Sequence, residues 1–312
     1  QTSPEPHAAR WTPYLASLLL LAPLQLNFLY FQTGILLVWL FLLGMRLLPR
    51  RPLLAGVVWS LAISIKVIPA VLLPWMLWRR QWRCVLGTLL GLFVGNAAVL
   101  GYTGWNKGVQ QYQGYVQMLR SDPVFAEYNE RYQSLPSLIR ATVTPHYESR
   151  IESTAQAKSW DGVRNFLGQT PLARHADALV LLAIGLVLAA CAWACRPGRP
   201  SGPWRLLQEG SLITLAMLLV SPHTWRHYYW WLWPTVLCAV HAARTRRPWA
   251  IAIVAVVAAT EFLPHRGLIG ELAIWYQVFH GHTIGALVVF ALLATHLIRN
   301  EPEPANTEPA QP

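Results

Sequence analysis

One long stretch of this sequence contains no acidic residue at all: neither aspartate nor glutamate lies between Glu5 and Asp122. Inside that stretch, apolar runs are interrupted only by short groups of basic and amide side chains. An average soluble chain is about 25% charged, whereas only 12% of this chain is charged and 54% is hydrophobic. The pattern therefore predicts an integral membrane protein with several crossings.

The distribution of basic residues also indicates a membrane protein. The formal net charge is +11, and the arginines gather in short clusters between the apolar runs. Short cytoplasmic loops of membrane proteins carry such clusters, and tryptophan and tyrosine, here 16 and 11 residues, mark membrane interfaces. We therefore interpret the charge as a membrane-orientation signal and expect no nucleic acid partner. The four cysteines lie in or beside apolar runs, without zinc-site spacing, and predict no metal site.

The distribution of polar residues divides the chain into five parts. The middle part is long and nearly charge-balanced, with eight basic and six acidic residues, and long loops of this kind are not held inside by their charge. A tail rich in proline and glutamate is typical of disorder. The expected parts are a polar N-terminal stretch (1–10), N-terminal membrane segments with broken helices (11–104), an extracytoplasmic loop (105–175), C-terminal membrane helices (176–298) and a disordered cytoplasmic tail (299–312).

Two apolar segments carry polar groups that predict breaks. Residues 11–48 are too long for one crossing of about 20 residues, and the amides at 25–34 predict a break there. The segment 53–78 has arginines at both ends, so both ends are expected on the cytoplasmic side. Two half-helices meeting near Lys66 and Pro69 satisfy that rule, because proline interrupts a helix. A straight helix that violates the rule is the alternative; we favour the bend.

Lys66 is the first candidate functional residue. It lies near the middle of its apolar segment, where an ionisable side chain is costly and marks a functional site by default. An ammonium at that depth needs an anion, such as a phosphate, or a water-filled cavity. The alternative is a lysine whose long stem lets the ammonium reach the membrane interface.

Two further groups of polar residues are candidates for binding. The stretch 221–229 contains His223, Arg226 and His227, which are suited to grip a phosphate or sugar hydroxyls. The same stretch also fits an interfacial belt of tryptophan and tyrosine anchored by arginine. Gln133 and Ser134 lie in the long polar part beside aromatic residues. This composition suits a sugar-binding site, and it fits a solvated loop equally well.

Together these pieces resemble glycosyltransferase family 87, membrane enzymes of the GT-C type that use polyprenyl-phosphate sugars. The resemblance covers roughly residues 20–240 and departs from the family pattern in two places. The family has Gly-Gln-x-Asn where this chain has Phe31-Gln32-Thr33-Gly34, and its second paired histidine is Tyr228 here. The matching pieces are the amide-bearing break ending at Gln32, Pro52-Leu53-Leu54-Ala55-Gly56, Lys66-Val67-Ile68-Pro69, Gln133-Ser134-Leu135 and Ser221-Pro222-His223-Thr224-Trp225-Arg226-His227.

The resemblance implies an all-α, GT-C-like polytopic helix bundle with a large extracytoplasmic loop, in a bacterial-type cytoplasmic membrane. It implies transfer, with inversion, of a hexosyl (mannosyl-like) or pentosyl group from a polyprenyl-phosphate sugar to a hydroxyl of a glycan or glycolipid on the outer face, without a cofactor. The donor phosphate would be bound by Lys66, Arg226 and His227. The sugar or acceptor pocket would contain Gln32, Gln133, Ser134, His223 and Trp225.

The general base is the missing part of this expectation. GT-C enzymes generally place an essential aspartate in the first outer loop, and this chain has no aspartate before Asp122. We therefore expect the chain to be truncated at its N-terminus, with the base in the region that precedes it. Two other classes remain open: a transporter or lipid flippase, which would also use an intramembrane lysine and a bent helix, and a non-enzymatic membrane scaffold.

Overall fold

The computed structural model describes residues 6–121, 132–143, 171–197, 202–222, 224–270 and 272–299. Within these ranges every named element is helical, and the only β-pairing is an isolated bridge between Tyr132 and Trp225. The elements are α1 (Pro6–Leu19), α2 (Leu21–Leu29), α3 (Gly34–Leu47), α4 (Pro52–Ile65), η1 (Ile68–Val71), α5 (Leu72–Trp78), α6 (Trp82–Thr103), α7 (Trp105–Ser121), α8 (Leu135–Val143), η3 (Pro171–His175), α10 (Ala176–Ala194), α11 (Pro203–Val220), η4 (Arg226–Leu232), α12 (Trp233–Ala243), α13 (Pro248–Val257), η5 (Ala258–Phe262), α14 (Arg266–Ile269), α15 (Leu272–Val278) and α16 (Gly281–Arg299).

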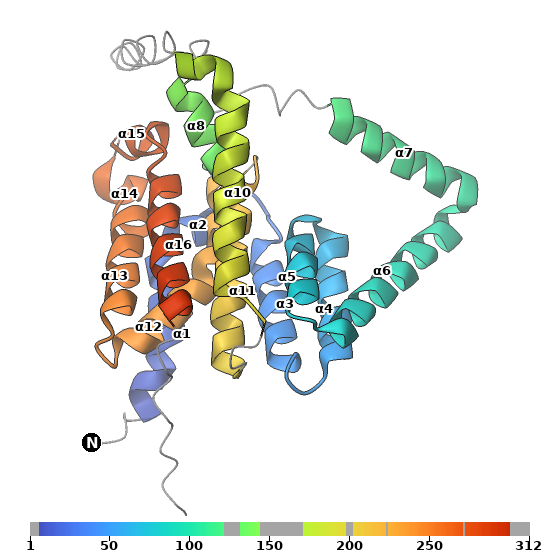
Figure 1. The fold of residues 1–312 in the computed structure, drawn as a ribbon, viewed down its shortest axis with the longest axis horizontal. Helices are drawn as coiled ribbons and strands as arrows, with labels where there is room; N and C mark the ends of the chain where they lie inside the picture. Colours follow the sequence, from blue (N-terminus) through green and yellow to red (C-terminus); the bar gives the residue numbers. More distant parts are fainter. Residues whose placement is uncertain are drawn as a thin grey trace, which may run out of the picture.

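The helices have the length and composition of a membrane protein. Among the described residues, α6, α10 and α16 are each long and apolar enough to cross a bilayer. A fourth span is possible if Trp11–Leu19 and α2, which meet at an angle of 74°, count as one broken span. Helix α11 lies within the body, buried along most of its length, and packs against α3, α10, α12 and α16, whereas α6 and α7 project away from the body (Figure 1). The predicted all-α membrane fold is confirmed.

The chain reverses direction at Lys66. Helices α4 and α6 pack in parallel: a Cβ atom at Gly87 would meet Leu53, and one at Gly91 would meet Ser60. Two consecutive parallel helices require a return segment between them, which is supplied by η1 and α5. Lys66 itself has extended backbone (φ −153, ψ 128) and ends α4. The bend expected at Lys66 is therefore present, and the straight-helix alternative is wrong.

The expected break over residues 25–34 is only partly correct. Helix α2 continues through Gln25 and Asn27, so the non-helical residues are confined to 30–33. Pro23 lies in the first turn of α2, where its missing N–H removes no hydrogen bond. The buried amide of Asn27 donates to the carbonyls of Pro23 (2.9 Å) and His227 (2.8 Å). These partners let an amide remain inside a membrane helix.

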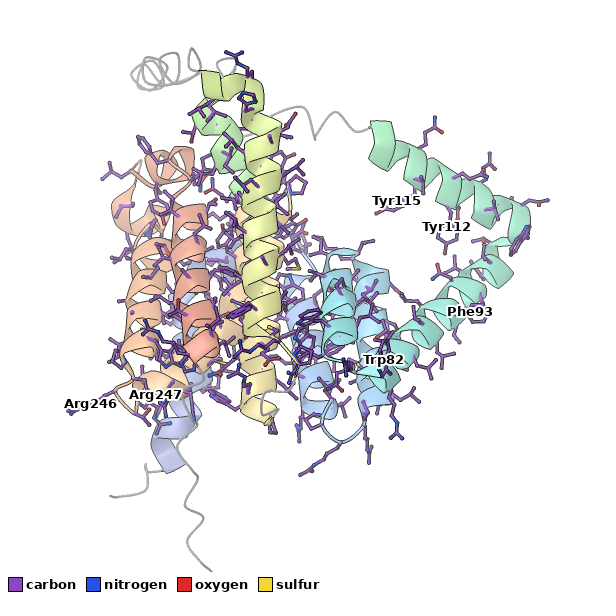
Figure 2. All side chains as sticks on the ribbon, viewed as in Figure 1. Trp82, Phe93, Tyr112, Tyr115, Arg246 and Arg247 are labelled. Carbon is purple, nitrogen blue, oxygen red and sulfur yellow. The ribbon has the colours of Figure 1, made fainter. Side chains whose placement is uncertain are left out.

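Helices also occupy regions expected to be irregular. Helix α1 begins at Pro6, inside the expected polar stretch 1–10. The range 105–175 begins with helix α7, because apolar residues at 105, 109, 112 and 116 recur at helical spacing, and it also contains α8 and η3. Figure 2 shows Tyr112 and Tyr115 pointing into the angle between α7 and α6. The extracytoplasmic side of this range stays a prediction, and the tail beyond residue 299 lies outside the described residues.

A buried ion-pair cluster joins the helix ends near the arginine clusters. Glu209 on α11 is 0% exposed and lies 3.2 Å from the Nε atoms of both Arg79 and Arg205. Arg79 also donates to the carbonyl of Arg196, and Arg205 to that of Leu297, each at 3.0 Å. Basic residues far apart in sequence thus gather at one end of the bundle, at the bottom of Figure 1, as the positive-inside pattern requires.

Candidate active site

A cleft of about 1080 Å³ opens at the end of the bundle opposite the Glu209 cluster. One wall is the C-terminal part of α2 with the turn at Tyr30 and Phe31. The facing wall is formed by Gln133 and by the residues that enter η4, and α15 closes the side. The cleft therefore collects residues from segments that are far apart in the chain, at the end where Figure 1 shows α8, α14 and α15.

The two loop motifs found in the sequence meet at this cleft. Gln133 donates its backbone N–H to the carbonyl of Thr224 (2.7 Å), next to the bridge between Tyr132 and Trp225. The buried hydroxyl of Tyr229 donates to the carbonyl of Gln133 (3.0 Å). These bonds fix the segment before α8 against the segment that precedes η4, and so give the cleft a rigid wall.

Aromatic rings form the surface of that wall. The ring of Trp225 stacks on His227 with centroids 6.2 Å apart, and the ring of Tyr132 meets Trp225 edge-on at 5.6 Å. Tyr30, from the opposite wall, lies 6.1 Å from His227. Aromatic faces of this kind combine a large apolar surface with specific geometry, so they suit the apolar faces of a sugar ring.

Two nitrogen atoms in the cleft wall have unused hydrogen-bonding capacity. Arg226 Nε and His227 Nε2 are buried and have no hydrogen-bond partner among the described residues. The remaining contact of the Arg226 guanidinium is a long one, 3.5 Å from Nη2 to the carbonyl of Pro264. Buried polar atoms are normally satisfied, so unsatisfied ones indicate a place for a ligand. An arginine in this state fits a phosphate, because its planar guanidinium donates in pairs to phosphate oxygens.

Lys66 lies next to this wall but does not line the cleft. Its Nζ atom sits 3.9 Å from the centroid of the Tyr228 ring, a cation–π contact. Its charge acts on the neighbouring His227. The break between α4 and η1 places this half-buried ammonium beside η4. Lys66, Arg226 and His227, the three residues expected to bind the donor phosphate, therefore lie close together.

The other expected pocket residues have different positions. Gln133 and Trp225 line the cleft. Gln32 instead turns its amide toward the carbonyl of Tyr30 (3.3 Å) and lies outside the lining. Ser134 is wholly buried at the start of α8, where its hydroxyl accepts from Ser137 N–H (3.4 Å) and thus supports the helix. His223 lies outside the described residues.

Some cleft residues were not assigned to the site from the sequence. Gly267 N–H donates to His265 Nδ1 (3.0 Å), so the ring carries its proton on Nε2 and donates to Gln25 Oε1 at 2.6 Å. Gln277 also lines the cleft, and its carbonyl accepts from the Gln133 amide (2.9 Å). The amide of Gln25 in an apolar run was an available signal, whereas His265 and Gln277 stand in no recognisable pattern.

Phe31 occupies a conformation that suits glycine. Its φ is +49, in the left-handed region, and its side chain is 95% exposed at the cleft. This is the position where the pattern Gly-Gln-x-Asn has its glycine, which adopts such a φ without steric cost. The next helix begins at Gly34, where a Cβ would collide with the side chain of Asn27. Phe31 and Gly34, the two positions at which this chain differs from Gly-Gln-x-Asn, therefore lie at either end of one tight turn at the cleft.

Comparison with known proteins agrees with the resemblance. The model of glycosyltransferase family 87 matches residues 2–222. A polyprenol-phosphate-mannose-dependent alpha-(1-2)-phosphatidylinositol mannoside mannosyltransferase of Mycolicibacterium smegmatis is 27% identical over 293 residues, which cover 88% of this chain. The protein of the same description from Mycobacterium tuberculosis is 26% identical over 300 residues, again 88% of this chain. The chain spans 59% of the length of each relative. No solved structure matches it.

Proposed function

Because this chain belongs to glycosyltransferase family 87, we propose that it transfers a mannosyl group from a polyprenyl-phosphate donor to an acceptor hydroxyl. The two relatives carry descriptions that name a polyprenol-phosphate-mannose donor and a phosphatidylinositol mannoside acceptor. A pentosyl group is the other sugar class that we expected from the sequence. The transporter alternative has no support among these relatives.

The observation that carries the proposal is the unsatisfied Arg226 Nε and His227 Nε2 beside an aromatic wall. In the reaction, the acceptor oxygen attacks C1 of the sugar while the bond from C1 to the phosphate oxygen breaks. The electron pair stays on the lipid phosphate, and the acceptor proton passes to a base. Arg226 and His227, with Lys66 adjacent, would stabilise the charge that develops on the phosphate.

The remaining cleft residues suit the sugar. Trp225 would stack on one face of the ring, and Gln133 with the His265–Gln25 pair would hydrogen-bond its hydroxyls. The described cleft residues include no aspartate or glutamate, and we assign no residue to the base. The acceptor would be a glycolipid or glycan hydroxyl at the outer face of the cytoplasmic membrane, the side on which we place the cleft.

The test is a transfer assay with the full-length protein in proteoliposomes. Radiolabelled polyprenyl-phosphate mannose is supplied with a phosphatidylinositol mannoside acceptor, and the label is followed by chromatography of the lipids. We expect the label to move to the acceptor and unlabelled polyprenyl phosphate to accumulate. Intact donor that crosses the bilayer without cleavage would instead identify a flippase, and donor that stays unchanged in place would reject both activities.

A further inference from the structure

A second buried carboxylate lies next to the cleft, outside the residues used so far. Glu261 is 0% exposed, and both of its oxygens lie 3.0 Å from Nδ1 of His282, which is also 0% exposed. Glu261 belongs to η5, a π-helical turn at the end of α13, and His282 lies in the first turn of α16. Single π-turns within α-helices are rare and occur frequently at functional sites.

The packing around this pair is close and specific. A Cβ atom at Gly285 would collide with Thr260, and one at Gly281 would collide with the ring of Tyr276. Tyr276 meets His282 edge-on, with ring centroids 4.9 Å apart. Gly285 therefore lets α16 approach the π-turn, and Gly281 lets it approach the ring of Tyr276 in α15; this packing keeps the carboxylate away from water. Such a carboxylate is costly to bury unless a cation compensates its charge.

Arg226 brings a permanent positive charge to the same region: its Nη2 atom lies 3.5 Å from the carbonyl of Pro264, three residues after Glu261, and among the described residues no direct ion pair joins it to Glu261. The charge of Glu261 acts on the Arg226 guanidinium, and Tyr276 lies within reach of both charges. Arginine stays protonated in proteins, so its charge is always present. Arg226 thus lines the cleft, has a buried Nε without a hydrogen-bond partner among the described residues, and feels the charge of a buried carboxylate nearby.

We propose that Glu261, oriented by His282, is the internal counter-ion of Arg226 and limits the affinity of the cleft for the phosphate product. This inference rests on the proposed function. The donor is a phosphate diester with one negative charge. When the bond to C1 breaks, the polyprenyl phosphate that remains is a monoester, whose second ionisation has a pKa of about 6.

The difference in charge creates a problem that a counter-ion solves. A seat made only of cations binds the doubly charged product more tightly than the singly charged donor, so the product would block the next turnover. The field of Glu261 repels the product twice as strongly as the donor. Glu261 is thus a positioning and charge-tuning residue: it acts through Arg226 and does not touch the substrate.

The first measurement uses the wild-type, full-length protein at pH 8. Inhibition constants are determined for polyprenyl phosphate and for its methyl diester, which has the same lipid and one charge fewer. We expect the product to bind at most about tenfold tighter than the diester, because Glu261 offsets the charge of Arg226 and leaves the Lys66 ammonium as the uncompensated cation. Product binding more than tenfold tighter than diester binding would overturn the proposal.

The second measurement uses Glu261→Gln, which keeps the shape and removes the charge. We expect the inhibition constant of polyprenyl phosphate to fall about tenfold relative to that of the methyl diester, the scale of one unit charge at an effective dielectric constant of about 20. Turnover should also fall, because tighter binding of polyprenyl phosphate slows product release. If Glu261 had only a structural role, the Glu261→Gln variant would bind both lipids more weakly than the wild type, so both inhibition constants would rise.

Glu209→Gln is the matched control, because it removes an equally buried carboxylate at the far end of the bundle. We expect it to lower thermal stability without changing the ratio of the two constants. Arg226→Gln separates this inference from the proposed function. If Arg226→Gln leaves donor and product binding unchanged, the phosphate seat itself is wrong. If it weakens both while Glu261→Gln has no effect, only the counter-ion role is wrong.

Discussion

The two ends of the bundle use the same residue types in opposite ways. At the Glu209 end, both arginines pair with the carboxylate and donate to backbone carbonyls. At the cleft, Arg226 has a carboxylate near it but keeps unsatisfied donor capacity, as does His227. A carboxylate paired with two arginines holds helices together, whereas an arginine without a direct ion pair is available to an anion. The two ends therefore differ in charge pairing: Arg79 Nε, like Arg226 Nε, makes no hydrogen bond to a described residue, but the charge of Arg79 is paired with Glu209 at 3.2 Å.

The comparison predicts that damage at the Glu209 end is a stability effect. Glu209→Ala leaves Arg79 and Arg205 buried without their shared counter-ion. We expect a loss of about 3–5 kcal/mol in the free energy of unfolding, measured by denaturant unfolding in micelles. Activity per folded molecule should stay at the wild-type value. A stable Glu209→Ala protein would remove the distinction between the two ends.

Damage at the cleft should affect chemistry more than the fold. Arg226→Gln removes a charge that stabilises the departing phosphate, and removing one such donor typically costs about 100- to 1000-fold in turnover. The melting temperature should fall less than in Glu209→Ala, since among the described residues the guanidinium makes one long hydrogen bond, to Pro264, and Glu261 keeps its contacts with His282. The transfer assay and a thermal melt on the same preparation provide both numbers. A collapse in melting temperature would place Arg226 with the structural arginines.

Lys66→Met tests the cation that lies beside the cleft. Methionine keeps an apolar stem and removes the ammonium, which lies over the Tyr228 ring. We expect turnover to fall by about 100-fold with folding retained. Lys66→Arg serves as the charge-preserving control and should recover part of the activity. Wild-type turnover in Lys66→Met would exclude a role in phosphate binding.

The smallest effect is expected for a substitution at the cleft that changes stability only slightly. Phe31→Gly relieves a left-handed residue, which costs roughly 1–2 kcal/mol when it is not glycine, and the exposed ring loses little packing. We expect the protein to become about 1 kcal/mol more stable, a rise of a few degrees in melting temperature. A matched Tyr30→Gly variant, at negative φ (−97), should lose stability.

Sequence reasoning succeeded where the cause was local or electrostatic. Arginines on both sides of one apolar run favoured a reversal at Lys66, and the chain does reverse there. It failed where tertiary contacts decide. Gln25 and Asn27 are helical because distant partners, His265 and the carbonyl of His227, accept or donate their hydrogen bonds. The spacing of residues along the chain does not indicate those partners.

The buried carboxylates show the same division. From the sequence, Glu209 was one acid near an arginine and Glu261 one acid near a segment end. Their different environments arise from which helices meet them: α5 brings Arg79 to Glu209, and α16 brings His282 to Glu261. Such assignments require the packing of helices, which no local pattern specifies.

The reversal at Lys66 has a consequence for experiments that count crossings. A hairpin that enters and leaves on the same side adds two apolar helices but no change of compartment. Reporter fusions placed after Arg50 and after Arg80 should therefore give the same signal. We expect a topology that treats residues 53–78 as one crossing to have the wrong parity and to assign every later junction, including the cleft residues that follow residue 78, to the opposite compartment.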